Sequence, residues 1–313
     1  MFRSHLPIAI TAALFALAST AATAAPPIAI QTKATDAAAS GFYRMPLGKF
    51  TVIALADGNF DMPAPKLLHE DKPGIVKSLL GKAGYTDTVP TSINGFLIDT
   101  GNKRVLIDTG TGGALAPTTG KLLDHLRAAG YEPAQIDEIL ITHLHPDHVG
   151  GVTHDGKAVF PNAVLRVSAA DVGYWADDAK TASKDVIAAL APYRAAGHLK
   201  TFAADATLES GITAVDTAGH TPGHTSYLVE SDGKKLLVWG DLLHVAAVQF
   251  ADPKVTIQYD SAPAQAEAQR AKVLAAATKN GEWIAAAHIA FPGIGHVVKA
   301  GDAYAWQPVD VTR

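Results

Sequence analysis

Residues 139–151 read ILITHLHPDHVGG, an apolar run that leads into a dense group of polar side chains. The apolar residues at 139–141 are typical of a short buried strand, and three histidines and one aspartate follow between positions 143 and 148. Burying that many polar groups costs several kcal/mol unless each group finds a partner. A divalent cation is such a partner, because imidazole and carboxylate groups suit zinc and similar first-row metals. The stretch therefore predicts a metal site at the end of a strand.

The spacing of these polar residues indicates two neighbouring positions for cations. His143 and His145 are two residues apart, so in an extended turn both side chains can face one point. Asp147 and His148 come one turn later and can reach a second point nearby. The alternative interpretation, a polar loop with incidental histidines, does not account for this density directly after a buried strand.

The composition of the chain limits its class and its metal ligands. Of its 313 residues 48% are hydrophobic, which is enough for a substantial core, and the net charge of −4 includes no long run of one sign. A nucleic-acid binder or a protein of anionic membranes would need a basic patch, so neither partner is expected. The absence of cysteine excludes disulfides, thiolate metal sites, iron–sulfur clusters and a cysteine nucleophile. Histidine, aspartate and glutamate must hold any metal.

The first residues of the chain have the layout of a secretory signal peptide. Arg3 supplies the positive start, residues 7–18 are mostly apolar, and Ala-Thr-Ala at 22–24 resembles a cleavage site. The apolar run is shorter than the ~20 residues of a spanning helix, so no membrane anchor is expected after cleavage. We therefore expect a signal peptide at 1–24, a flexible arm at 25–42 and one domain at 43–313. The mature protein is expected in the periplasm or outside the cell.

Periodicity along the remaining chain predicts alternating strands and helices in one α/β unit. Asp57-Gly58 is typical of a turn after the first strand. Helices are expected at 119–129, over most of 168–197, and at 262–279. Strands are expected at 49–55, 92–100, 104–108, 136–142, 212–216, 226–230, 235–239 and 282–287.

Five short motifs in order resemble the metallo-β-lactamase superfamily. They are H-x-H-x-D-H at 143–148, Asp-Thr-Gly at 108–110, GHTPGH at 219–224, Gly-Asp at 240–241 and Ala-His at 287–288. Each motif alone is weak, but together they cover residues 45–300 in the family's sequence order. The resemblance implies an αββα sandwich, in which two mixed sheets face each other with helices outside and the metals lie at one edge.

The resemblance also implies a ligand set for two divalent metal ions, zinc first, with manganese, iron and cobalt as alternatives. One ion would be held by His143, His145 and His220, and the other by Asp147, His148 and His288, with Asp241 bridging both. In the family, a hydroxide shared by the two ions attacks a carbonyl or phosphoryl centre. Asp147 and Asp241 would be the catalytic carboxylates, with Asp147 passing a proton to the leaving group.

Four further segments look like the methyl parathion hydrolase branch of that superfamily. They lie at 92–97, 129–131, 245–250 and 291–296. This likeness implies a small-molecule lactone, aryl ester or phosphotriester as substrate, and it also leaves room for a homodimer. The phosphotriesterase members carry an apolar residue at the position of His244 and a basic one near Leu67, whereas this chain has histidine at 244 and leucine at 67. Opening of lactones or cleavage of aryl esters is therefore favoured, with phosphotriester hydrolysis as the alternative.

Two alternatives belong to other classes of protein. A mononuclear iron persulfide dioxygenase shares this fold but lacks the second metal site, which argues against it here. A metal-binding protein without catalysis would not need a bridging aspartate beside an open water position. The residues expected to line the substrate pocket are His244, Trp175, Leu115 and Phe250, against the interpretation that they are ordinary packing residues. His224 and Asp108 are expected to support the loops and ligands by hydrogen bonds.

Overall fold

Two seven-stranded sheets make up most of the computed structural model, which describes Met1 and residues 40–311. Residues 2–39 and 312–313 lie outside the described residues, and with them nearly all of the expected signal peptide and arm. The described residues of the arm include Phe42, which already pairs with Leu55 at the edge of the first sheet. Among the described residues, no helix has the length and apolar character needed to cross a membrane.

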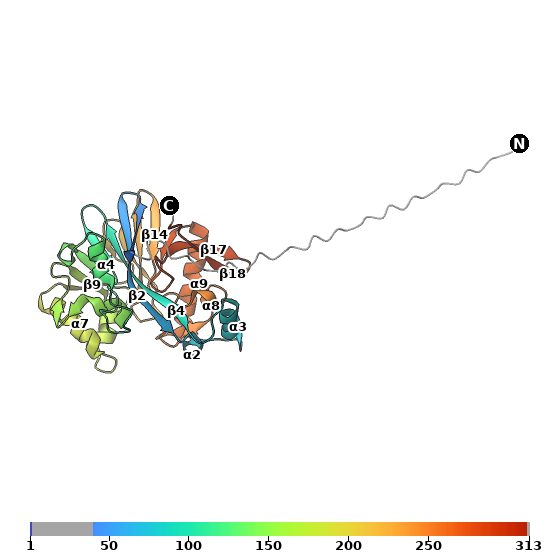
Figure 1. Cartoon of the computed structure of the whole chain (residues 1–313), viewed down its shortest axis with the longest axis horizontal. Coiled ribbons are helices and arrows are strands. Elements are labelled where there is room, and N and C mark those ends of the chain that lie inside the picture. The colour runs from blue at the N-terminus through green and yellow to red at the C-terminus, as the bar shows by residue number, and fades with distance from the viewer. Residues whose placement is uncertain (2–39, 312–313) are drawn as a thin grey trace. The chain divides into compact units, whose positions relative to one another are not determined.

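The first sheet combines antiparallel hairpins with a parallel half (Figure 1). Its first four strands are antiparallel neighbours, and the last three run parallel to the strand before them. In spatial order the strands are β1 (Phe42–Leu47), β2 (Phe50–Met62), β4 (Val89–Asp99), β5 (Arg104–Ile107), β6 (Glu138–Leu140), β9 (Val164–Ser168) and β10 (Leu199–Phe202).

The second sheet is antiparallel except for one parallel pair in its centre, β14 with β16. In spatial order its strands are β11 (Thr207–Glu209), β12 (Ile212–Asp216), β13 (Thr225–Ser231), β14 (Lys234–Val238), β16 (Trp283–Ala285), β17 (Ile294–Ala300) and β18 (Ala303–Pro308). Both sheets are therefore mixed, as the family resemblance implies.

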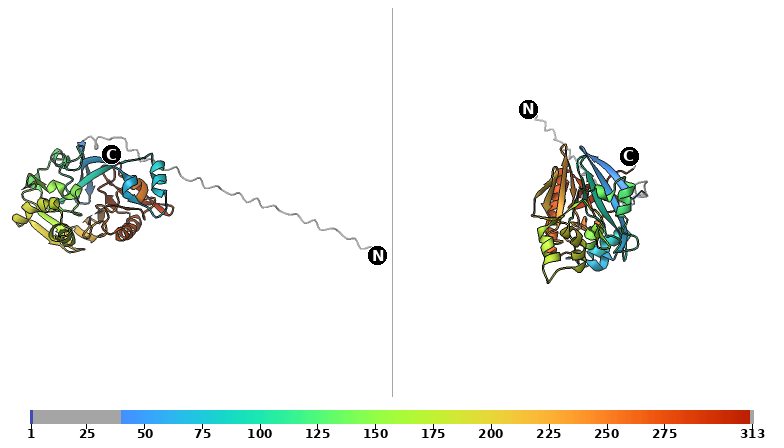
Figure 2. Two further views of the ribbon diagram at one scale, coloured as in Figure 1. Left: turned by 90° about the horizontal axis from the view of Figure 1, so that it is seen from below. Right: turned by 90° about the vertical axis from the view of Figure 1, so that its left-hand side faces the viewer.

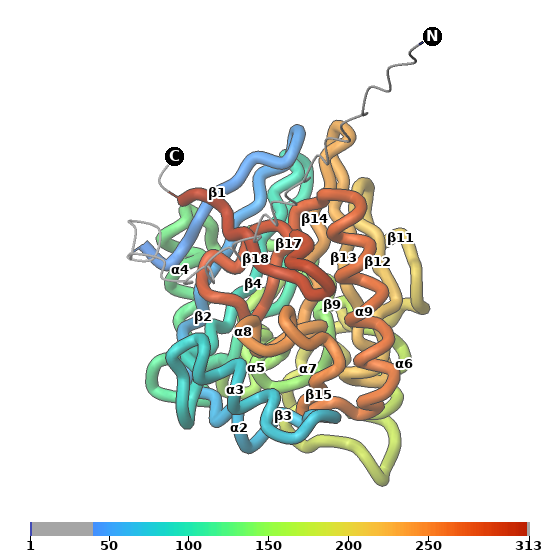
Figure 3. Tube along the Cα trace, turned by 90° about the vertical axis from the view of Figure 1, so that its right-hand side faces the viewer, coloured from blue at the N-terminus to red at the C-terminus, as the bar shows by residue number. Residues whose placement is uncertain are grey.

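Alternating side chains divide the core into layers. In β2, Val52 and Ala54 pack in the cluster between the two sheets, whereas Ile53 and Leu55 pack on the opposite face. That outer face is covered by α4 (Leu122–Ala128) and α7 (Lys184–Ala195), and α9 (Pro263–Asn280) covers the outer face of the second sheet. Figure 2 shows the two sheets facing each other, and Figure 3 shows α9 outside the second one. The αββα prediction is confirmed.

Short elements fill the ends of the sandwich. A fourth apolar cluster packs α2 (Ala64–Leu67), β3 (Leu68–His69), α3 (Ile75–Lys82), α8 (Ala246–Gln249) and β15 (Thr256–Ile257) beside the end of β2. The remaining short elements are η1 (Pro133–Gln135), α5 (Pro146–Val149), η2 (Gly150–Val152), β7 (Thr153–His154), β8 (Lys157–Ala158) and α6 (Ala169–Val172), with a π-helical turn at Gly173–Asp177.

The turn expected at Asp57-Gly58 is wrong. Strand β2 continues through these residues, with a shift of pairing register between Ala56 and Gly58. The shift turns the Asp57 side chain into the protein, where its carboxylate accepts hydrogen bonds from the backbone N–H groups of Thr111, Gly120 and Leu122. A polar residue that is typical of turns here forms a bulge that anchors the loop between β5 and α4.

A buried carboxylate ties the parallel half of the first sheet together. Glu138, in β6, is 3% exposed and accepts hydrogen bonds from Lys103 Nζ at 3.1 Å and Arg166 Nε at 2.9 Å. Burial alone would raise the pKa of Glu138, but the hydrogen bonds from Arg166, Glu209 and Lys103 hold it below its ordinary value. The ionised form therefore stabilises the fold at neutral pH, and this contribution is lost as the pH falls.

Replacing Glu138 by glutamine is expected to lower the free energy of unfolding by about 2 kcal/mol at neutral pH, because two cations lose a charged partner. The deficit should shrink as the pH falls below the ordinary glutamate pKa, where the native side chain also becomes neutral. Urea denaturation at several pH values measures both effects. Glu230→Gln is the matched control, because its 2.8 Å ion pair with Lys235 is exposed and is expected to contribute about 0.5 kcal/mol or less. Equal costs for the two variants would contradict the prediction.

Candidate metal centre

The first group of histidines lies where β6 ends and α5 begins. Thr142 donates hydrogen bonds from its backbone N–H and its hydroxyl to the Asp108 carboxylate, both at 2.8 Å, which fixes the chain just before His143. Pro146 opens α5, a position that suits proline because the N–H it lacks has no partner inside a helix. His145 therefore precedes the helix, and Asp147 and His148 lie within it.

The other polar residues come from loops of the second sheet. His220 lies between β12 and β13, Asp241 follows β14, and His288 follows β16. Gly240, before the aspartate, has a φ of 56°, and a Cβ there would lie 2.7 Å from His224 Nε2. Glycine lets this backbone approach His224 closely. Side chains that are up to 145 residues apart in the sequence (positions 143 and 288) therefore meet at one edge of the sandwich.

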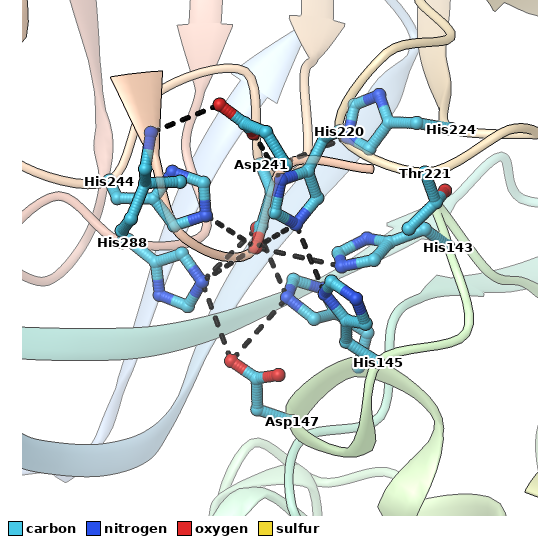
Figure 4. Close-up of polar contacts among 12 residues, drawn as sticks. His143, His145, Asp147, His220, Thr221, His224, Asp241, His244 and His288 are labelled. Atoms are coloured by element: carbon cyan, nitrogen blue, oxygen red, sulfur yellow. Dashed lines mark hydrogen bonds and ion pairs between the residues drawn. The ribbon is translucent and has the colours of Figure 1, made fainter. Parts of the chain in front are cut away.

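Asp241 lies at the centre of the cluster, and five histidines approach its carboxylate (Figure 4). On one side, its Oδ2 lies 3.6 Å from His143 Nε2 and 3.4 Å from His220 Nε2. On the other side, its Oδ1 lies 3.0 Å from His148 Nε2 and 3.1 Å from His288 Nε2. Among the described residues, three groups have ligand-type atoms that all lie within 4.8 Å of one another. They are His143, His145, His220 and Asp241; Asp147, His148 and His288; and Asp241, His244 and His288.

Several of these buried atoms have no hydrogen-bond partner, which is the test of whether the residues fit a cation. His143 Nε2, His148 Nε2 and Asp241 Oδ1 are buried without a hydrogen bond of acceptable geometry. Unpaired buried polar atoms are costly and rare, and here they converge on one space. The donor set of imidazole nitrogens and carboxylate oxygens suits first-row divalent metals. The residues therefore fit the two metal ions that the family resemblance implies.

Hydrogen bonds on the far side of the rings orient three of the histidines. The Nδ1–H of His148 donates to Asp108 at 2.8 Å, that of His220 donates to Asp260 at 2.8 Å, and that of His288 donates to the Ser92 carbonyl at 2.9 Å. In each ring the other nitrogen, Nε2, faces the cluster and is the atom that can bind a cation once its proton has left. Such bonds fix the tautomer and orientation of metal-binding histidines.

Charges within the cluster separate the pKa values of its members. Burial would raise the pKa of Asp241, but His148, His288 and His143 together hold it well below its ordinary range. Burial, reinforced by the neighbouring His220, lowers the pKa of His145 to about 3. Burial would also lower the pKa of His220, but its hydrogen bonds with Asp241 and Asp260 raise it to about 9. At neutral pH the centre thus combines an ionised aspartate with both neutral and protonated histidines.

The two residues expected to support the ligands form buried hydrogen bonds. His224 Nε2 accepts a hydrogen bond from the Asp241 backbone N–H at 2.9 Å, and its Nδ1–H donates to Thr217 Oγ1 at 2.9 Å. With both nitrogens occupied, His224 has no lone pair directed at the cluster. Burial lowers the pKa of its imidazole to about 3, so the ring is neutral. Asp108 joins Thr142 to His148, as described above.

The four residues expected to line a substrate pocket lie in different surroundings in the structure. Trp175 is half-buried and its ring contacts that of His145 edge-on at 5.4 Å, while Leu115 is exposed on the loop between β5 and α4. His244 is buried within the cluster, with its Nε2 3.0 Å from Asp241 Oδ2. Phe250 was assigned wrongly, because it is 3% exposed and packs on Trp239 and Trp306 in the core behind the second sheet.

Three residues near the centre are not identified by any pattern in the sequence. Asp171, in α6, accepts hydrogen bonds from the Leu144 N–H, the Thr221 hydroxyl and the Gly223 N–H, so it joins the two histidine loops. Tyr259 is 46% exposed, and burial together with the charge of Asp147 raises its pKa. Asp260 orients His220. An isolated aspartate or tyrosine carries no spacing signal, so only the fold identifies these three.

Comparison with known proteins gives one family and several similar structures. The model of the metallo-beta-lactamase superfamily matches residues 88–288. The crystal structure of hydrolase AbOPH is 38% identical, with a TM-score of 0.81, and the match covers 86% of this chain and 98% of that one. The dizinc quorum-quenching lactonase AidC, solved with a product, is 27% identical with a TM-score of 0.77, covering 86% and 98%.

Curated relatives match over shorter stretches. An N-acyl homoserine lactonase from a Bacillus species is 26% identical over 156 residues, which is 44% of this chain and 58% of the relative. The lactamase-like protein vrtG of Penicillium aethiopicum is 35% identical over 91 residues, which is 29% of this chain and 27% of the relative. The chain thus spans between about a quarter and three fifths of the length of these two curated relatives.

Metal binding is expected to release protons and to weaken as the pH falls. The pKa of His220 is raised to about 9 and that of His148 well above its ordinary value, so these two rings carry protons at neutral pH when no cation is bound. The pKa of His288 is raised as well. A cation must displace those protons. Calorimetric titration of chelator-stripped protein with zinc, in buffers of different ionisation enthalpy, measures the proton release. An affinity that does not change between neutral and mildly acidic pH would contradict this expectation.

Proposed function

Since the chain belongs to the metallo-β-lactamase superfamily, we propose that it is a metal-dependent hydrolase that uses two divalent cations to open lactones or cleave aryl esters. The convergence of seven histidine and aspartate side chains on one buried space carries this proposal. One cation would be held by His143, His145 and His220, and the other by Asp147, His148 and His288, with Asp241 between them. Zinc is the first expectation, with manganese, iron or cobalt as alternatives.

Two cations at these positions would lower the pKa of a shared water molecule and polarise the reacting oxygen of a bound substrate. The chain supplies the remaining functions. Asp241 is held ionised and, through the His224–Asp241 backbone hydrogen bond, in a fixed place. Asp147 is the most exposed carboxylate of the cluster, at 20% of its side chain, so it can exchange a proton with a leaving group.

The surroundings of the cluster support a substrate with an apolar part. Trp175 lies against His145, so an aromatic side chain is available beside the first ligand loop. Aromatic surfaces bind apolar groups, whereas polar groups in the pocket orient the reacting bond. This environment suits an aryl ester, or a lactone with an acyl or aryl substituent. Similarity to AidC and to the Bacillus lactonase points in the same direction.

Hydrolysis of phosphotriesters is the second candidate. The similarity to AbOPH and the resemblance to the methyl parathion hydrolase branch favour it. His244 argues for the first candidate, because a polar ring beside Asp241 stands where phosphotriesterase members of that branch carry an apolar residue. We therefore rank lactones and aryl esters above phosphotriesters.

His145→Ala is expected to reduce kcat/KM on the best ester or lactone by about 100-fold or more, because even outer partners of metal ligands contribute 10–100-fold. Circular dichroism should show an unchanged fold, since His145 lies at the partly exposed edge of the cluster. His154→Ala is the matched control, because the His154 side chain is 77% exposed and belongs to none of the groups of possible metal ligands. Retained activity in His145→Ala would reject the proposed ligand role.

Metal content per chain and initial rates on three substrates test the function as a whole. We expect two metal ions per chain and faster hydrolysis of an aromatic lactone and an acyl-homoserine lactone than of an aryl phosphotriester. A higher kcat/KM on the phosphotriester would favour the second candidate. One iron per chain without hydrolysis would favour a persulfide dioxygenase instead, and two metals without turnover on any of these substrates would favour a metal-binding protein without catalysis.

Export is part of the proposal and rests on the sequence of residues 1–24 alone. Cleavage after Ala24 would release a chain that begins with Ala25. Mass spectrometry of the protein recovered from periplasmic and culture fractions tests this expectation. A full-length chain confined to the cytoplasmic fraction would reject export while leaving the hydrolase proposal intact.

A further inference from the structure

We propose that Asp260, anchored by Arg270, is a positioning residue that fixes His220 and so controls the affinity of only one of the two cation positions. This inference rests on the proposed dinuclear function. Asp260 follows β15 and Arg270 lies within α9. Neither residue belongs to a motif of the family resemblance.

The contact between Asp260 and His220 determines which nitrogen of the ring faces the cluster. The Nδ1–H of His220 donates to Asp260 Oδ1 at 2.8 Å, and the Asp260 side chain has no exposed surface. With one proton held at Nδ1, Nε2 is the nitrogen left to bind a cation. That atom lies 3.0 Å from His145 Nδ1 and 3.4 Å from Asp241 Oδ2, within the first set of ligand atoms.

Arg270 holds the carboxylate in place and offsets its charge. Its guanidinium is 1% exposed and lies 3.9 Å from Asp260 Oδ2. Three backbone carbonyls fix the guanidinium, because Nε donates to Leu242 and Nη1 donates to Pro253 and Val255, all at 2.8–2.9 Å. Asp260 Oδ2 also accepts a hydrogen bond from the Ile257 N–H at 3.1 Å. A buried carboxylate held on both oxygens has little freedom to turn away from His220.

Backbone hydrogen bonds next to Asp260 also fix the loop that carries His220. The N–H groups of Ser261 and Ala262 donate to the carbonyls of His220 and Gly219, at 2.8 and 2.9 Å. Gly219 packs so tightly on the start of α9 that a Cβ there would lie 2.5 Å from Ala266 N. The segment at 260–266 therefore fixes both the main chain and the ring of His220.

The two cation positions have separate carboxylate supports. Asp108 accepts the Nδ1 hydrogen bond of His148 in the second ligand set, and Asp260 does the same for His220 in the first. Asp108 lies on the first sheet's loops, whereas Asp260 is attached to α9. A carboxylate that accepts from a ligand histidine raises the basicity of that ligand and fixes its orientation. Asp260 contacts a ligand of the first set alone and is expected to act on that position, whereas Asp108 also holds Thr142 beside His143 and so reaches both sets.

Asp260→Asn tests this proposal, with Asp108→Asn as the matched variant for the other position. Competition between the chelator-stripped protein and a chromophoric chelator measures the two stepwise zinc dissociation constants, and cadmium NMR of the loaded protein identifies the three-histidine position. For Asp260→Asn we expect one constant to rise by about 10–100-fold and the other to stay within about threefold. Asp108→Asn should weaken the other constant and, because Asp108 also holds Thr142 beside His143, is expected to affect the first one as well.

Unchanged constants in a folded Asp260→Asn protein, or equal weakening of both, would overturn the inference. Wild-type protein that binds fewer than two cations would instead reject the proposed function. If Asp260→Asn does not fold, heteronuclear NMR of the wild-type holoprotein decides the question, because the inference requires the Nδ1–H tautomer at His220 with a slowly exchanging proton. An Nε2–H tautomer there would overturn it.

Discussion

The burial of one carboxylate, that of Asp241, is the constraint on which the rest of the site depends. An ionised group in a protein interior is costly unless it is paired, and five histidines approach this one within 3.6 Å. Loops from both sheets must deliver those histidines to one point. The sandwich does so because its two sheets end at a common edge, where β6 of the first and β14 and β16 of the second stop.

The fold predicted from the motifs agrees with the structure. Each motif joins a strand to a polar loop, so it predicts the end of the strand and the position of the loop together. The core alternation in β2 and the hairpin of β4 and β5 are also local patterns that a sequence displays. Six strands of the two sheets were not predicted, namely β1, β9, β10, β11, β17 and β18. The helix expected over 168–197 is interrupted by a π-helical turn. Strand β1 pairs with β2, and β17 with β18, in local hairpins that the alternation of residues did not display. Strands β9 and β10 instead pair in parallel with partners distant in the sequence, which periodicity alone does not reveal.

The candidate site shows the same division between local and distant information. The seven proposed ligands lie in short motifs, but Asp171 and Asp260 act across 27 to 52 residues and through single hydrogen bonds. Phe250 shows the opposite error, since an aromatic residue after Asp241 suggests a pocket until the rings of Trp239 and Trp306 are seen around it. The motifs identify the residues proposed to bind the metals. The residues that orient those ligands can be identified only from the packing in the structure.

The spread of the cluster along the chain sets an order of events for maturation. The histidines of the first loop are in the middle of the chain, whereas His288 follows β16, which is near the end of the chain. A nascent chain therefore exposes half a binding site before the other half has been made. A cation captured early would meet only His143, His145 and their neighbours, so stable loading must await the docking of the two sheets. The metal would then bind late in folding and stabilise the contact between two sheets that hydrophobic packing has already brought together.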